Sequence, residues 1–280
     1  MLTFAQEDKE RLQLPAETRR LKIIEHLRAH ETAEVDAFAK MFSVSRMTVH
    51  RDLDALVEQR IVRKVRGGAT ILPSVVFEGD YAYRARLQGD EKSALGRAAS
   101  QLIEPGMAIV MDDSSTVAAV IPFILDKRPL TVVTNALPVI QMLDKAPGIT
   151  LIALGGILDP ICNAFLGILT EQSMRSIRVD LALLSTACVH GATAYLRVTD
   201  DAIRAKHAMM ESADRSVMMV DHTKFGKSAL NRFTELSRFD RVLVTDGLRR
   251  DHREALRRAK VRLELVRTTP SDASAPMRNA

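Results

Sequence analysis

The sequence predicts two domains of different fold class, an α+β winged helix-turn-helix followed by a larger α/β domain. Residues 35–70 contain two short amphipathic helices and then β-branched residues before a double glycine, Gly67-Gly68. From Glu91 onward, short β-branched segments alternate with helical ones, which is typical of a mostly parallel sheet covered by helices. The length of 280 residues suits a small domain and a larger one. We expect the first domain to span residues 17–72, the second 73–266, and a loose tail 267–280.

Composition and charge exclude several classes of protein. Hydrophobic residues make up 46% and charged residues 27%, as in ordinary globular proteins, and the net charge of +5 permits a polyanionic partner without requiring one. The two cysteines, Cys162 and Cys188, lie in apolar segments, and no Cys/His spacing indicates a metal site. Residues 1–20 carry charges where a signal peptide is apolar, and no segment approaches the ~20 apolar residues of a membrane helix. We therefore expect a cytoplasmic protein without a metal, a cofactor or a membrane partner.

Two helices are expected to support the first domain. Pro15 marks the start of one of them. Its buried face should consist of Leu21, Ile23, Ile24 and Leu27. The next helix has apolar residues at helical spacing, namely Val35, Phe38, Ala39 and Phe42. This helix should end at Ser43-Val44.

A third helix and a basic hairpin complete the predicted winged domain. Ser45 is placed to cap the helix, and Val49, Leu53 and Leu56 should face inward, which leaves a polar and basic outer face. Val62 and Val65 then alternate with basic residues, as in a two-stranded wing. Taken singly, these features indicate only packing or solvated surface, but their order fits a recognition helix in the major groove and a wing on the phosphates. The residues expected to contact double-stranded DNA are Ser45, Arg46, Thr48, His50, Arg51, Lys64, Arg66, Gly67 and Gly68.

The second domain begins after a segment that has no periodicity. Residues 71–90 contain proline, glycine and tyrosine without a repeat, which predicts a linker, and we place the domain boundary near residue 73. The strands that follow are expected at residues 107–111, 130–134, 149–154, 179–184, 217–221 and 242–245. Each ends in small or polar residues, and in an open α/β sheet ligands bind beyond the carboxyl ends of strands. The sequence therefore predicts a ligand site at this edge.

The segment Asp113-Ser114-Ser115-Thr116 is the most informative of these strand ends. Hydroxyl and N–H groups at the start of a helix can bind an anion such as phosphate, although Ser115 or Thr116 can equally be only the helix N-cap. Asp112 and Asp113 bring negative charge to the same loop, so either they face sugar hydroxyls or a lysine neutralises them. Lys206 and Lys224 are candidates for that charge. His207 and His222 have weaker claims, and no nucleophile elbow or dinucleotide fingerprint is present.

The N-terminal motifs resemble those of DeoR-family bacterial transcriptional regulators. The matching residues are Val44-Ser45, Thr48-Val49, Arg51-Asp52-Leu53, Lys64 and Gly67-Gly68-Ala69. His50 and Arg66 depart from the family pattern, which puts the operator sequence in question. Further along the chain, the segments that resemble the sensor domain of the same family are Asp113-Ser114-x-Thr116, Val133-Thr134-Asn135, Leu154-Gly155-Gly156, Gly167, Asp180, Lys206, Asp221-x-x-Lys224-Phe225-Gly226 and Thr245-Asp246.

This resemblance implies a Rossmann-like sensor domain with the fold of ribose-5-phosphate isomerase and glucosamine-6-phosphate deaminase. It also implies a repressor of carbohydrate genes that answers to a phosphorylated sugar or a similar metabolite. The phosphate loop departs from the family at Ser115, Thr116 and Val117, because a glycine and one hydroxyl are missing. The residues expected to bind the effector are Asp113, Ser114, Ser115, Thr116, Thr134, Asn135, Gly155, Gly156, Lys206 and Lys224.

Two other functions are compatible with the sequence. The chain could be a sugar-phosphate isomerase or deaminase with a DNA-binding appendage, and Asp113, Asp180 or Asp201 would then be the general base. Isomerisation needs an acid and a base that converge on adjacent carbons, and no such pair is evident, so we expect no catalytic residue and no enzyme activity. The winged domain could also mediate protein contacts. For a DNA-binding regulator we expect a homo-oligomer, a dimer or a multiple of it, because paired domains bind a two-fold operator.

Overall fold

A computed structural model describes residues 14–30, 32–58, 61–71, 81–196, 200–227 and 229–268 of the chain. The chain divides into two compact units, residues 1–79 and 80–280. The boundary predicted near residue 73 lies outside the described residues, as do most of the segment predicted as a tail and the first thirteen residues. Within the described parts, every helix is too short or too polar to cross a bilayer.

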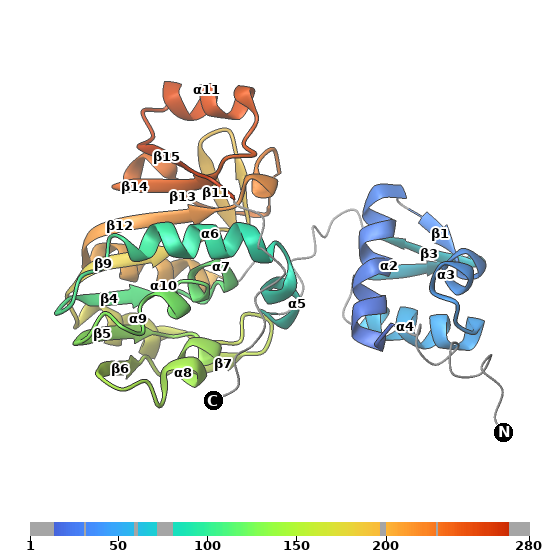
Figure 1. Ribbon diagram of the computed structural model, residues 1–280, viewed down its shortest axis with the longest axis horizontal. Helices are drawn as coiled ribbons and strands as arrows, with labels where there is room; N and C mark the ends of the chain where they lie inside the picture. The colour runs from blue at the N-terminus through green and yellow to red at the C-terminus, as the bar shows by residue number, and fades with distance from the viewer. Residues whose placement is uncertain are drawn as a thin grey trace. The chain divides into compact units, whose positions relative to one another are not determined.

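The first unit contains the three predicted helices and a small antiparallel sheet. The helices are α2 (Ala16–His30), α3 (Val35–Phe42) and α4 (Arg46–Glu58), and α2 begins directly after Pro15. The strands are β1 (Thr32–Glu34), β2 (Val62–Val65) and β3 (Gly68–Ile71), in the order β1-β3-β2 (Figure 1). The hairpin β2–β3 is the predicted wing, and β1, which is too short to show a pattern, joins its edge.

The inward faces predicted for α3 and α4 are confirmed. Val49, Leu53 and Leu56 of α4 are fully buried, together with Phe38 of α3 and Leu27 of α2. Ala39 is only half-buried. An ion pair that the sequence does not predict joins two of these helices: the Arg19 guanidinium on α2 donates to both carboxylate oxygens of Asp52 on α4, at 2.5 and 3.1 Å, and both side chains are buried.

The double glycine has a conformational reason and a packing reason. Gly67 lies in the turn of the wing with φ +79°, a conformation that favours glycine, and its carbonyl accepts a hydrogen bond from Val35 N–H at 2.9 Å. A Cβ atom on Gly68 would lie 2.2 Å from the carbonyl oxygen of Ala33 on β1. Any side chain at position 68 would therefore push β1 away from β3.

The second unit is built on a seven-stranded parallel sheet, which confirms its predicted α/β class. In spatial order the strands are β15 (Leu263–Val266), β14 (Arg241–Thr245), β12 (Ala213–Val220), β9 (Val179–Leu184), β4 (Ala108–Met111), β5 (Leu130–Thr134) and β6 (Ile149–Ala153). Every neighbouring pair is parallel. The six predicted strands are present, and β15 is the one that the sequence pattern does not predict. The chain runs from β4 to one edge and then returns to β9 on the other side of β4, so the order reverses between these two strands.

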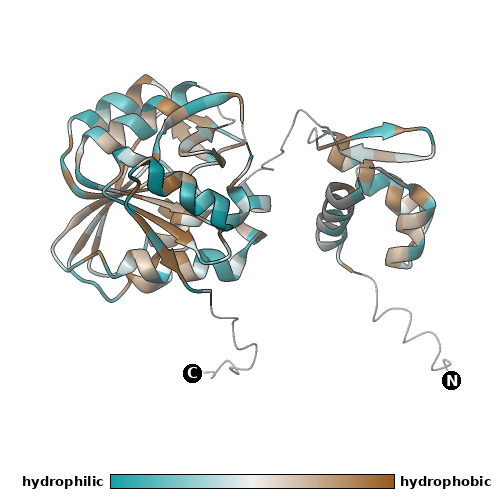
Figure 2. Ribbon diagram, turned by 90° about the horizontal axis from the view of Figure 1, so that it is seen from above, coloured by the Kyte–Doolittle hydropathy of each residue, from teal (hydrophilic) through white to brown (hydrophobic). Residues whose placement is uncertain are grey.

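Helices cover both faces of this sheet. The helices are α5 (Tyr81–Arg86), α6 (Gly89–Ser100), α7 (Ser115–Ala118), α8 (Leu137–Leu143), α9 (Ile168–Arg175), α10 (Asp200–Glu211) and α11 (Arg250–Arg258). One buried cluster packs α6, α7 and α8 against the sheet, and the other packs α9, α10 and α11. Figure 2 shows hydrophobic strands in the middle of the unit and polar outer surfaces on the helices.

Short elements fill the remaining connections. They are the hairpin β7 (Ile157–Asp159) and β8 (Ala164–Leu166), the antiparallel strands β10 (Cys188–His190), β11 (Thr193–Leu196) and β13 (Asn231–Glu235), and the 3-10 turns η1 (Ile121–Phe123), η2 (His222–Lys224) and η3 (Leu236–Arg238). The linker predicted up to Asp90 is wrong for its second half, because residues 81–86 form α5 and α6 begins at Gly89. A six-residue helix is less than two turns long and cannot display a helical repeat.

Candidate functional site

A buried lysine between two buried aspartates occupies the point where the strand order reverses. Asp112 and Asp113 follow β4, and Lys206 comes from α10. The Lys206 Nζ lies 2.5 Å from Asp112 Oδ2 and 2.7 Å from Asp113 Oδ1, and all three side chains are buried. Of the two arrangements considered for this loop, the structure therefore contains the one in which a lysine neutralises the aspartates.

The pKa values of these groups follow from their mutual charges. Burial alone would raise the pKa of the Asp113 carboxyl, but the charges of Lys206 and Arg84 outweigh burial and hold that pKa below its usual value. Burial acts to lower the pKa of Lys206, and the charges of Asp112 and Asp113 outweigh it, so that pKa is raised. Both shifts favour the ionised forms of Asp113 and Lys206 at neutral pH.

Asp112 also fixes the loops on both sides of the reversal point. Its Oδ1 accepts hydrogen bonds from Ser114 N–H at 3.0 Å and Ser114 O–H at 2.6 Å, and its Oδ2 accepts one from Ser185 N–H at 2.8 Å. The Ser114 hydroxyl oxygen in turn accepts from Val117 N–H at 3.2 Å, so Ser114 is the N-cap of α7. The alternative that Ser115 or Thr116 caps this helix is wrong, because the cap is Ser114.

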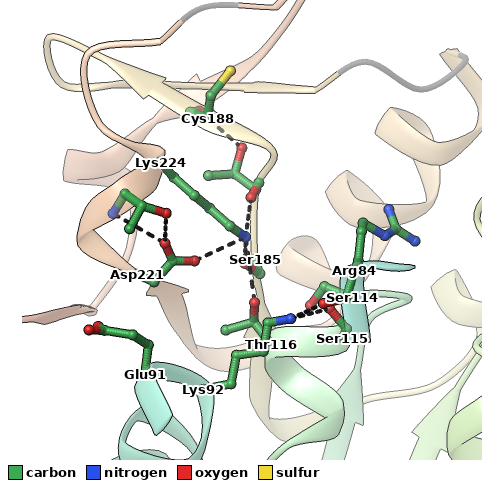
Figure 3. Close-up of polar contacts among 12 residues, drawn as sticks. Arg84, Glu91, Lys92, Ser114, Ser115, Thr116, Ser185, Cys188, Asp221 and Lys224 are labelled. Carbon is green, nitrogen blue, oxygen red and sulfur yellow. Dashed lines mark hydrogen bonds and ion pairs between the residues drawn. The ribbon is translucent and has the colours of Figure 1, made fainter. Parts of the chain in front are cut away.

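Two further lysines reach the hydroxyl groups of α7 (Figure 3). Lys92 from α6, which is buried, donates to Ser115 Oγ at 3.0 Å and also to the Arg84 carbonyl. Lys224 from η2 donates to Thr186 O at 2.8 Å and Ser185 Oγ at 3.3 Å, and its Nζ lies 3.5 Å from Thr116 Oγ1. Lys92 is a site residue that the sequence pattern does not single out, since nothing distinguishes it from other lysines on helices.

The other predicted effector residues shape the ends of β5 and β6. Thr134 O–H donates to the Met111 carbonyl at 2.8 Å, and Asn135 Nδ2 donates to the Phe165 carbonyl at 2.9 Å. The Gly155 carbonyl accepts from Thr170 O–H at 2.7 Å. Gly156 has φ +151°, and a Cβ atom there would lie 2.3 Å from Thr170 Oγ1. The bonds of Thr134, Asn135 and Gly155 hold the backbone in place beside the loop after β4, and Gly156 leaves room for the Thr170 side chain.

The carboxylates considered for catalysis do not converge. Asp113 is paired with Lys206. Asp180 lies near the amino end of β9, where its Oδ2 accepts from Ala108 N–H at 2.7 Å. Asp201 forms an exposed ion pair with Arg204. The two histidines are also separate: the His207 ring lies 5.1 Å from that of Phe233, whereas His222 Nδ1 lies 3.3 Å from Glu91 Oε2 and 3.1 Å from Thr245 Oγ1.

The polar face of α4 forms the second candidate surface. The predicted cap is confirmed, because Ser45 Oγ accepts from Thr48 N–H at 3.1 Å. Arg51 is exposed, and His50 and Thr48 are half-buried at the helix surface. Arg46 is exposed as well, and its guanidinium lies 3.0 Å from the Asp36 carboxylate.

The wing carries its own exposed cations. Lys64 is exposed and forms an ion pair with Asp54 of α4, and Arg66 is exposed beside the turn at Gly67. Exposed ion pairs of this kind contribute little to stability and exchange readily for other partners.

The chain combines a winged helix-turn-helix with an α/β domain that has a charged site where the strand order reverses. This combination is typical of DNA-binding regulators with a sensor domain. The family model described as the DeoR-like helix-turn-helix domain matches residues 19–75, and the one described as the DeoR C terminal sensor domain matches residues 87–247. The chain belongs to the DeoR family of transcriptional regulators.

Curated relatives agree with this assignment. The chain is 32% identical to the HTH-type transcriptional repressor GlcR of Bacillus subtilis (strain 168), over 83% of this chain and 89% of that one. It is 28% identical to a putative aga operon transcriptional repressor of Escherichia coli O157:H7, over 89% and 93% of the two chains. A ribose 5-phosphate isomerase A structure from Methanocaldococcus jannaschii is 18% identical, with a TM-score of 0.36 over 49% of this chain and 54% of that one. The chain is therefore a transcriptional regulator, and the alternative of an isomerase with a DNA-binding appendage is not favoured.

The buried charge cluster makes a prediction about stability and pH. The lowered pKa of Asp113 means that its stabilising contribution is present above the ordinary carboxyl pKa and is lost as pH falls through the lower, folded-state value. In Lys206→Met, burial should instead raise that pKa above its unfolded value, so the variant should lose stability as pH rises. We expect the variant to be destabilised by about 3–5 kcal/mol at neutral pH and by less near pH 4, measured by thermal unfolding.

A matched control is Lys127→Met. Lys127 donates to the Ile103 carbonyl at 2.9 Å and not to a carboxylate, so its loss should lower the unfolding temperature by a similar amount at both pH values. If Lys206→Met lowers the unfolding temperature by the same amount at both pH values, the role given to the aspartates is contradicted.

Proposed function

We propose that this regulator is a repressor of genes for carbohydrate or related metabolism, controlled by a phosphorylated metabolite that binds at the ends of β4 and β9. The observation that carries the proposal is the meeting of Lys92 and Lys224 at the hydroxyl groups of Ser115 and Thr116. A phosphate dianion can accept several charge-assisted hydrogen bonds from ammonium and hydroxyl groups, each stronger than a bond between neutral groups. The names of the relatives, both repressors, support the direction of control.

The geometry supports three roles for the predicted effector residues together with Lys92. Asp113 is paired with Lys206, and Lys206 and Ser114 have their polar atoms engaged by Asp112 and Asp113 or by the cap of α7, so these three residues would position the loop. Lys92, Lys224, Ser115 and Thr116 carry the donors that would bind phosphate. The remaining predicted residues, Thr134, Asn135, Gly155 and Gly156, hold the neighbouring strand ends, beside which the sugar part of the effector would lie.

The effector proposal predicts a preference for the phosphorylated member of a matched pair. Isothermal titration with a panel of hexose phosphates and the corresponding free hexoses should give binding only with phosphate present. Lys224→Met should weaken the binding of any phosphorylated ligand by about 1.5–3 kcal/mol, the range for hydrogen bonds to charged groups. Lys127→Met serves as the control and should bind like the parent. Equal affinity for both members of the pair, or an unchanged affinity in Lys224→Met, would return these residues to a structural role.

We also propose how the winged domain contacts operator DNA. The side chains of Arg46, Thr48, His50 and Arg51 would face the major groove, whereas Lys64, Arg66 and the backbone of Gly67-Gly68 would contact phosphates. The exposed polar face of α4 and the exposed wing support this division. The partners of Arg46 and Lys64 are themselves exposed, so both cations can turn to DNA at little cost.

The two kinds of contact should respond differently to substitution. Arg51→Ala should cost about 1–3 kcal/mol with the operator and relax the preference for particular bases, because a contact to a base edge is lost. Lys64→Ala should weaken binding to all sequences and reduce the slope of log K against log salt by about one. Fluorescence anisotropy with operator and scrambled duplexes measures both effects. Parent-like binding by both variants would show that this docking is wrong.

A homo-oligomer held together by the sensor domain completes the proposal. Large apolar side chains are exposed together on the β7–β8 hairpin and the first turn of α9: Ile157 is 77% exposed, Ile161 and Ile168 62%, and Leu169 61%. Apolar side chains gathered in this way are typical of association surfaces. The parent should sediment as a dimer or a multiple of it at micromolar concentration, and Ile161→Asp should shift it toward the monomer. A monomeric parent would contradict the proposal.

A further inference from the structure

The positive charge of the chain is concentrated on the last helix of the sensor domain. Residues 249–262, which include α11, contain seven arginine and lysine residues and two acidic ones, a net charge of +5. The whole chain has the same net charge, +5, so the other residues balance to zero. Figure 1 shows α11 at the edge of the unit, next to β14 and β15.

These cations face the solvent. α11 packs on the sheet through buried Leu256, and the next buried residue along the chain is Val261. The exposed basic residues around this narrow contact are Arg249, Arg250, Arg257, Arg258, Lys260 and Arg262. Residues 249–262 thus expose six basic side chains and two acidic ones, Asp251 and Glu254.

Only half of these exposed cations have an acidic partner. Arg249 pairs with Asp251, Arg250 with Glu254 and Arg262 with Asp240, at 2.7–2.9 Å. Among the described residues, no acidic side chain lies within ion-pair distance of Arg257, Arg258 or Lys260. These three cations lie together at the end of α11 and just beyond it.

Helix stability alone does not account for this distribution. Cations at the carboxyl end of a helix are favourable, which suits Arg257 and Arg258. At the amino end they are unfavourable, yet Arg249 and Arg250 occupy that end, and Arg249 provides no side-chain cap. A helix that carries cations at both ends therefore calls for a second explanation.

We propose that the basic surface of α11 binds the phosphate backbone of DNA, in addition to the contacts made by the winged domain. The partner is inferred from chemistry: closely spaced, mostly arginine side chains without acidic partners match a polyanion with closely spaced phosphates. The chain is a DNA-binding regulator, so DNA held by the winged domain is present near the sensor domain at a high effective concentration. A surface that is weak on its own then adds to affinity, without sequence preference.

The salt dependence of DNA binding by the full-length chain tests this proposal. The variant R257Q/R258Q/K260Q removes three charges from exposed positions. If each cation contacts a phosphate, the slope of log K against log salt for a long duplex of random sequence should fall by about one per contact, so by as much as about three. Binding between about 50 and 200 mM salt can be followed by fluorescence anisotropy.

The matched control is R175Q/R178Q/R204Q, which removes the same formal charge from exposed ion pairs elsewhere on the sensor domain. Charges farther away than the screening length of about 10 Å act weakly. If α11 contacts DNA directly, the slope of log K against log salt should therefore be smaller for the α11 variant and unchanged for the control. Glu254→Gln, which makes α11 more basic, should strengthen binding. The proposal would be overturned if the two triple variants gave equal slopes. It would also be overturned if the α11 variant kept the slope of the parent, which is the result expected if the surface binds an acidic protein or an anionic membrane.

Discussion

The sensor domain depends on the ion cluster of Asp112, Lys206 and Asp113. Burying two carboxylates at the end of a strand is costly unless a cation and hydrogen bonds compensate them. Lys206 supplies the cation from α10, and N–H groups of the loops after β4 and β9 supply hydrogen bonds to Asp112. One carboxylate thereby joins the two strands between which the sheet order reverses. The loop that carries Ser115 and Thr116 is thus fixed before any ligand arrives.

The same cluster gives Lys206 a structural role that Lys92 and Lys224 do not share. Lys206 is buried between two anions, so its charge is already balanced. Lys224 donates to the Thr186 carbonyl and the Ser185 hydroxyl, neutral oxygens that compensate an ammonium group less completely than a carboxylate does, and its Nζ lies 3.9 Å from the Asp221 carboxylate. An anion would therefore gain most by approaching the side of α7 where Lys224 reaches Thr116. In the winged domain, Asp52 also forms a buried ion pair that fixes an element. Its pairing with Arg19 fixes α4, while Arg51 beside it stays exposed.

Sequence patterns predict the parts of this structure that depend on neighbours along the chain. The inward positions of α3 and α4, the cap at Ser45 and six of the seven parallel strands follow from local periodicity. The ion pair of Arg19 with Asp52 and the bond of Lys92 to Ser115 join residues 33 and 23 positions apart, so no local pattern contains them. The sequence names Lys206 and Lys224 as candidates to neutralise the aspartates but cannot choose between them, because the choice depends on α10 lying against the loop after β4.

The arrangement of charges also bears on the general base that an enzyme would need. A general base must accept a proton near the working pH, and a carboxylate whose pKa is lowered by an adjacent lysine is poorly suited to do so. Asp113 is such a carboxylate, and neither Asp180 nor Asp201 converges on it. If an effector binds here, as we propose, the free energy of binding would be available to favour one conformation over another. The contacts of Lys92 and Lys224 join α6 and η2 to α7, so the anion that we propose would act on three elements at once.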